Sequence, residues 1–253
     1  MDSEAVNAAA TRFEKFRRSR IDLVNDENPL TPAESEGVPA WWRELGSNGR
    51  RNAARVAAEW AKVFPTAFER LRDEVAVACE VYPARLESPK RSGVCLLYVF
   101  DPVVEDRPLI ALGFPPASSI TGIAATLPPE LHQFYLAMHD GFDANVAAGA
   151  KCVPGSGDLT NAQEVAGMYD ETREYLAVPV PYEPHVADLI AIWTDDTSGL
   201  HAFIDSTRAE GNCWRSAGGI LDSVDDAAYP RSTALDEIEQ GILPEIGWWD
   251  RHG

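Results

Sequence analysis

The five histidines are the side chains in this sequence best suited to a metal site or to general-base catalysis. His132 and His139 are seven residues apart, so on one helix they would share a face two turns apart. At a rise of about 1.5 Å per residue, they are too far apart for one ion to bind both imidazoles. His201 falls on a predicted strand, His185 in a predicted loop and His252 near the C-terminus. The positions of the five histidines in the sequence therefore indicate no catalytic set.

Short catalytic motifs are also missing. The sequence contains no GxGxxG, GxxxxGK[ST], HExxH or GxSxG pattern. A site can still be assembled from residues that are distant in sequence. On these motifs, however, we expect a protein that is not an enzyme and that needs no cofactor or metal.

Clustered carboxylates are the other candidates for function. Asp195 and Asp196 lie in a predicted hairpin turn, where Asp is also favoured because its side chain bonds nearby backbone. The segment Asp222-Ser223-Val224-Asp225-Asp226 alternates carboxylates as a calcium loop does, but it lacks the glycine and the final glutamate of an EF-hand. A solvated loop is the simplest interpretation of this segment, electrostatic contact with a partner the next, and a metal site the least favoured.

Two further glutamates extend this acidic surface along a predicted helix, and one tryptophan offers an aromatic anchor of the kind that dominates protein interfaces. The full set of predicted partner-binding residues is Asp195, Asp196, Asp222, Asp225, Asp226, Glu171, Glu174 and Trp214.

The net charge of −18 is concentrated in one part of the chain. Residues 1–100 contain 15 basic and 15 acidic side chains, whereas residues 101–253 contain 7 basic and 25 acidic ones. Such a charge disfavours contact with nucleic acid phosphates and with anionic membranes. It attracts a basic partner, most strongly at low salt. Solubility alone explains a negative total, but it explains the segregation less well.

The sequence also bears on the compartment. The first residues are acidic and lack the apolar stretch of a secretory signal. The four cysteines form no CxxC motif, so free and mostly buried thiols are expected. The long uncharged run 108–129 contains several prolines and glycines, which favour loop and strand over a membrane span. We therefore expect a cytoplasmic protein.

Residues 1–105 are predicted to form a mainly helical region. Apolar side chains between Val6 and Phe16 recur at helical spacing, and those from Val56 to Phe64 do so again before Pro65. Thr66-Ala67-Phe68-Glu69 matches a capping box, which predicts a helix that runs through Cys79 and ends before Pro83. Val94 to Phe100 is an apolar run rich in strand formers.

Residues 106–253 are predicted to mix helices and strands. Leu127 to Glu130 indicates the start of a helix, and Gly141 is placed to cap the C-terminal end of that helix. A second helix is predicted from Glu164 to Leu176, and a third from Ala234 to Ile246. The alternating segment from Leu189 to Asp205, with Gly199 at its turn, is the clearest hairpin in the chain.

These last elements carry a resemblance to a known family. Leu127-Pro128-Pro129-Glu130-Leu131, followed by Phe134-Tyr135 and by His139-Asp140-Gly141, resembles the hallmark of the SUKH superfamily. The later hairpin and closing helix are similar to the elements that follow in that family, and the match covers roughly residues 110–250. One departure is Thr121-Gly122-Ile123-Ala124-Ala125, which stands where the family has a glutamate-rich first helix.

The resemblance implies an α+β fold, in which a mixed or antiparallel SUKH-like sheet is flanked by helices over residues 106–253. Bacterial members are typically immunity proteins that bind and block a secreted toxin, often a nuclease, and other members are interaction modules. We therefore expect an immunity protein that neutralises a basic toxin by stoichiometric contact. The alternative is a regulatory or scaffolding module with a non-toxin partner, and the oligomeric state is left open.

Overall fold

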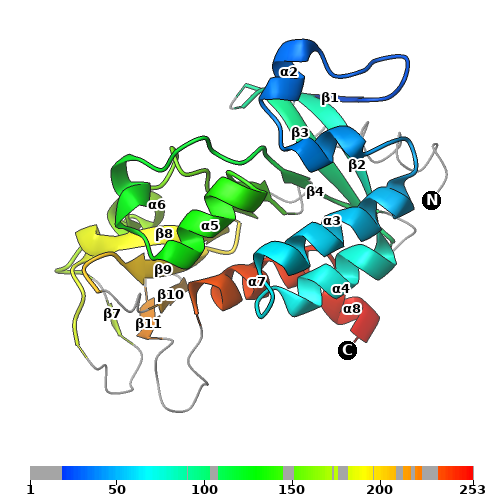
Figure 1. Cartoon of the computed structure of the whole chain (residues 1–253). Coiled ribbons are helices and arrows are strands. Elements are labelled where there is room, and N and C mark those ends of the chain that lie inside the picture. The colour runs from blue at the N-terminus through cyan, green and yellow to red at the C-terminus, as the bar shows by residue number, and fades with distance from the viewer. Residues whose placement is uncertain are drawn as a thin grey trace.

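The computed structural model describes residues 19–89, 91–102, 108–144, 151–172, 174–175, 182–195, 197–208, 213–217, 220–223 and 233–252. Within these ranges the chain forms an eleven-stranded sheet in the order β1-β2-β3-β4-β5-β6-β8-β9-β10-β11-β7, with helices packed against it (Figure 1). Neighbouring strands are antiparallel except β11 and β7, which are parallel. The predicted α+β class is therefore confirmed.

The first part of the sheet is a meander of four strands with a helical insertion. Its strands are β1 (Arg20–Leu23), β2 (Cys79–Glu87), β3 (Gly93–Phe100) and β4 (Leu109–Gly113). Between β1 and β2 lie α2 (Pro32–Glu36), η1 (Ala40–Glu44), α3 (Gly49–Val63) and α4 (Glu69–Ala78). The predicted helix before Pro65 and the predicted strand up to Phe100 are thus confirmed, whereas β1 and β2 had not been predicted.

Two short strands, β5 (Phe142–Asp143) and β6 (Lys151–Val153), connect this meander to the rest of the sheet. The second part consists of β8 (Leu189–Asp195), β9 (Leu200–Asp205), β10 (Cys213–Ala217), β11 (Ile220–Ser223) and β7 (Glu174–Tyr175). β8 and β9 form the predicted hairpin, and Gly199 at its turn has a φ of +68°.

The remaining helical elements lie in the second part of the chain. They are η2 (Gly122–Thr126), α5 (Pro129–Gln133), the π-helical turn η3 (Phe134–Met138), α6 (Ala162–Ala166), η4 (Val186–Asp188), α7 (Ala234–Glu245) and α8 (Trp248–His252). The closing helix was predicted, and Pro244 falls in its last turn. In the part of the chain that the structure describes, no helix is both long and apolar enough to cross a membrane.

One hydrophobic core joins the two parts of the sheet. Trp60 of α3 and Phe68 have ring centroids 4.9 Å apart, and Phe134 lies 6.0 Å from Trp60. The same core continues through Ile192 of β8 to Ile238 of α7. α7 lies between α4 and β8 and contacts both (Figure 1). The charge of the sequence changes near residue 100, but residues from both sides of that point pack in the same core.

The predicted capping box before α4 is wrong. Phe68 stands at the N-cap with a φ of +55° and makes no side-chain capping bond, so Thr66 does not start the helix. Phe68 takes this strained conformation while its ring is buried against Trp60. The predicted extent of the helix is also wrong, because Cys79 begins β2 and pairs with Phe100. Strand pairing overrides the helical spacing there.

The predicted helix from Glu164 to Leu176 is mostly wrong as well. Asn161 caps α6 by accepting a hydrogen bond from the Glu164 amide, and the helix ends at Ala166. Gly167 follows in the left-handed conformation, with a φ of +61°, and stops it. Glu174 then joins β7. The predicted helix around Val6 to Phe16 lies outside the described residues.

Candidate functional site

Asp195, at the end of β8, makes hydrogen bonds within its own hairpin turn. Its carboxylate accepts hydrogen bonds from the backbone N–H and the hydroxyl of both Thr197 and Ser198, and Lys151 lies 3.4 Å away. Burial raises the pKa of this carboxyl, but the bonds from Ser198 and Thr197 outweigh burial and hold the pKa below its usual range. Asp195 is 5% exposed, so it supports the hairpin turn and presents little charge to a partner.

Trp214, on β10, is a core residue. Its side chain has no exposed surface. Its ring centroid lies 5.6 Å from that of Tyr182, and it packs with Phe203 and Leu221 in a small cluster under α6. The predicted anchor at this position is therefore corrected: in this fold Trp214 fixes the second part of the sheet and does not face solvent.

Two other predicted residues, Glu174 and Asp222, lie on the paired strands β7 and β11 at one edge of the sheet. Glu174 in β7 pairs with Ile220 of β11, and Asp222 follows two residues later on that strand. Glu171 precedes β7 by three residues. Glu171 and Glu174 are exposed and Asp222 is partly exposed. The remaining predicted residues, Asp196, Asp225 and Asp226, lie outside the described residues.

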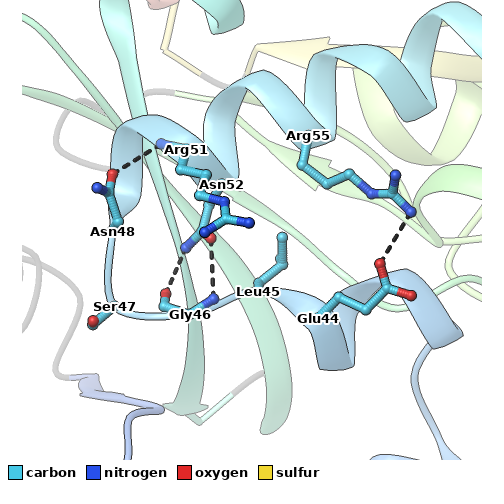
Figure 2. A pocket seen from close by; sticks show the side chains of 8 residues that line it. All are labelled: Glu44, Leu45, Gly46, Ser47, Asn48, Arg51, Asn52 and Arg55. Atoms are coloured by element: carbon cyan, nitrogen blue, oxygen red, sulfur yellow. Dashed lines mark hydrogen bonds and ion pairs between the residues drawn. The ribbon is translucent and has the colours of Figure 1, made fainter.

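A hollow beside the start of α3 was not predicted from the sequence. It has a volume of about 440 Å³ and lies in front of the start of α3 (Figure 2). Its lining consists of Glu44, Leu45, Gly46, Ser47, Asn48, Arg51, Asn52 and Arg55. A turn of Gly, Ser and Asn leading into an arginine-rich helix is the signal in the sequence that could have indicated it.

A buried asparagine holds the wall of this hollow in place. Asn52 Nδ2 donates to the Gly46 carbonyl, at 2.7 Å, and its Oδ1 accepts from the Gly46 N–H (Figure 2). Asn52 Nδ2 also donates to the Val81 carbonyl, at 2.9 Å. Asn48 Oδ1 accepts from the Arg51 N–H and caps α3. Arg55 pairs with Glu44 and Glu59, each at 3.2 Å. The loop is thus fixed before any ligand arrives.

A second hollow, of about 300 Å³, adjoins the first at the same loop. It shares Leu45, Gly46 and Ser47 with the first and is otherwise lined by Val24, Asn25, Asp26, Pro29, Leu30, Ser35, Trp42, Arg43 and Pro83. Its walls are therefore more apolar than those of the first, as is typical of small-molecule sites with few polar groups.

One of the candidate histidines, His139, is part of the core. His139 is fully buried, with Nε2 2.8 Å from the Tyr98 hydroxyl and Nδ1 3.0 Å from the Phe114 carbonyl oxygen. Burial lowers the pKa of His139 to about 4, so it is neutral at pH 7. Among the described residues, no group of three or more His, Cys, Asp or Glu side chains is placed to hold a metal ion.

Comparison of the chain with known protein families, characterised proteins and solved structures gives no match. The functional argument therefore rests on the sequence and on the geometry described above.

Proposed function

We propose that this protein is an immunity protein, which binds a basic, secreted bacterial toxin and neutralises it by stoichiometric contact in the cytoplasm. The observation that carries this proposal is the segregation of charge: the whole excess of −18 falls within residues 101–253. A nuclease is the toxin class that such a surface fits best, because a cleft that attracts phosphates also attracts carboxylates.

The sequence resemblance to the SUKH superfamily supports the same proposal. It extends over roughly residues 110–250, the part of the chain that carries the excess charge, and its bacterial members are typically immunity proteins. On this proposal, the SUKH-like part of the chain, residues 106–253, contacts the toxin. Inhibition of this kind needs charge complementarity and a matching surface but no catalytic group.

The contact residues proposed from the structure lie at the β7–β11 edge. Glu171 and Glu174 are exposed there, and Asp222 is partly exposed. Asp196, Asp225 and Asp226 stay in the proposed set on their sequence positions alone. Asp195 takes part indirectly, since its carboxylate fixes the backbone of Thr197 and Ser198. This acidic edge would raise the association rate, and the raised rate would fall as salt screens the charges.

A charge-reversal pair tests the proposal against the toxin encoded by the neighbouring gene. The double variant Glu171→Lys/Glu174→Lys changes the net charge by +4 at the proposed contact. The control, Glu27→Lys/Glu87→Lys, makes the same change at exposed positions in residues 1–100. We expect the contact variant to slow association with the toxin about tenfold or more at low salt, and the control to slow it far less.

Two results would count against this proposal. If the wild-type protein failed to protect cells that express the toxin, the immunity function would be wrong, and a regulatory or scaffolding module would become the better hypothesis. If protection were intact but both double variants bound the toxin equally fast, the immunity function would stand and the proposed contact edge would be wrong.

A further inference from the structure

The two hollows share residues 45–47 in their lining and are together called the 45–47 site below. The amide oxygens of the asparagines in their walls are already in use: Asn48 Oδ1 accepts from the Arg51 N–H, and Asn52 Oδ1 accepts from the Gly46 N–H. On the far wall, Asn25 Oδ1 accepts from the amides of Glu27 and Asn28. A ligand of this site would therefore be recognised through acceptors of its own.

One donor in the site is buried and unused. Trp42 is 1% exposed and lines the second hollow, and its indole Nε1–H has no hydrogen-bond partner. Leaving a buried donor unpaired costs about 1–3 kcal/mol, and native structures rarely do so without a reason. An acceptor atom bound beside Trp42 would recover this cost.

Two arginines of the site are also without a carboxylate partner. Within the described residues, Arg43 and Arg51 make no ion pair, although acidic side chains outnumber basic ones 40 to 22 in the sequence. Most other described arginines pair with a carboxylate within 4 Å, as Arg50 does with Asp101 and Arg85 with Glu34. Both guanidinium groups are exposed beside one loop, so they are available to an anionic ligand.

The acidic groups of the site do not cancel this charge. Glu44 is committed to Arg55, and Asp26 is exposed at the rim of the second hollow. The amino end of α3, a helix of 15 residues, adds partial positive charge to the first hollow. Leu30, Pro83 and the Trp42 ring supply an apolar wall in the second hollow.

We infer that the 45–47 site binds a small organic ligand through an oxyanion, with Arg43, Arg51 and the Trp42 N–H as its donors. The oxyanion is a phosphate ester or a carboxylate, since both offer several acceptors to a guanidinium. The body of the ligand lies against the apolar wall of the second hollow. This inference does not depend on the immunity function, because the site lies in the part of the chain with no excess charge.

The test follows the indole N–H signals of the ¹⁵N-labelled full-length protein by NMR during titration. Inorganic phosphate is the probe in one arm and acetate in the other, both at pH 7 and constant ionic strength. We expect a saturable shift of the Trp42 signal, assigned with Trp42→Phe, in at least one arm. Trp60 is the internal control, because it is equally buried but lines neither hollow.

Matched arginine variants complete the experiment. Arg51→Gln and Arg43→Gln should each weaken binding about tenfold or more, as expected for loss of a charge-assisted hydrogen bond. Arg20→Gln, an exposed arginine that pairs with Asp22, should leave it unchanged. A response to phosphate alone assigns a phosphate ester, and a response to acetate alone assigns a carboxylate. The inference is wrong if no shift saturates, if Trp42 and Trp60 respond alike, or if all three arginine variants bind equally.

Discussion

His139 is a buried titratable residue whose two ring nitrogens both have partners. The Phe114 carbonyl can only accept, so Nδ1 carries the proton, and the neutral Nε2 then accepts from the Tyr98 hydroxyl. There is no room for a side chain at Gly113, because a Cβ atom would lie 2.4 Å from His139 Cε1. A cation at this position would lose hydration without gaining a counter-charge.

This environment predicts a loss of stability in mild acid. The pKa of His139 is about 4 in the fold, below its unfolded value of 6.5, so the unfolded state takes up the proton first. Stability from neutral His139 is complete above pH 6.5 and falls as the pH drops from 6.5 to 4, by about 3 kcal/mol. Urea unfolding across this range should show the fall, and His185→Gln, at an exposed histidine, should preserve it.

His139→Gln should reduce this dependence between pH 6.5 and 4. If that variant does not fold, the imidazole signals of the wild-type protein give the pKa of His139 directly. A measured pKa above 6 would contradict the prediction.

Glu34 gives a pH dependence of the same sign, at lower pH. Its hydrogen bond and ion pair with Arg85, at 2.7 Å, lower its pKa to about 2 from a usual value of 4.5. The stabilisation is therefore present above pH 4.5 and is lost as the pH falls through 2. Both side chains are partly exposed, so we expect Glu34→Gln to cost about 1 kcal/mol at pH 7 in chemical unfolding. The difference from wild type should shrink below pH 4.5, and the exposed control Glu36→Gln should show no such difference.

At the scale of elements, α8 is held to α4 by a buried carboxylate. Glu74 is 3% exposed and receives Arg251 Nε and, at 3.0 Å, His252 Nε2. Arg251 also donates to the Asp101 and Ile246 carbonyls. The Arg70 guanidinium lies 5.7 Å from the Trp248 ring and adds a further contact. A helix of five residues gains little from its own hydrogen bonds, so these contacts determine its position.

Removing the guanidinium should therefore release the C-terminal helix. Arg251→Met leaves Glu74 buried with a weaker partner, and we expect it to cost about 3 kcal/mol in chemical unfolding. Amide hydrogen exchange in α8 should rise more than exchange in α3. Arg20→Met is the control, since Arg20 is exposed and pairs only locally with Asp22. Equal stability of the two variants would show that Glu74 does not hold α8.

The elements also show what the sequence can predict. The helix through Val56 and Trp60 and the hairpin around Gly199 follow from periodicity and turn chemistry, and both are present. The end of α4 could not be predicted, because Cys79 pairs with a strand that follows more than ten residues later. The 45–47 site depends on Asn52 reaching the Val81 carbonyl, 29 residues away, and no local pattern carries that contact.

For the whole molecule, the charge boundary and the core boundary do not coincide. All of the excess charge follows residue 100, yet Leu131 and Phe134 on one side of that point pack in the same core as Trp60 and Phe68 on the other. β4 and β8 belong to one sheet through β5 and β6. The net charge can change along a chain without a break in the core. Each surface charge is hydrated on its own, whereas the apolar side chains of a core must contact one another.

This continuity predicts that the acidic part does not fold alone. A fragment of residues 106–253 would expose the apolar surface that Trp60, Phe64 and Phe68 cover in the full chain. Each large side chain lost from a core typically costs 3–5 kcal/mol, and a domain has only about 5–15 kcal/mol in total. The fragment should lack near-ultraviolet circular dichroism and dispersed amide signals, whereas the full chain should unfold in one transition by both fluorescence and circular dichroism. A fragment that folds cooperatively, or two separate transitions in the full chain, would show that the molecule has two independent cores.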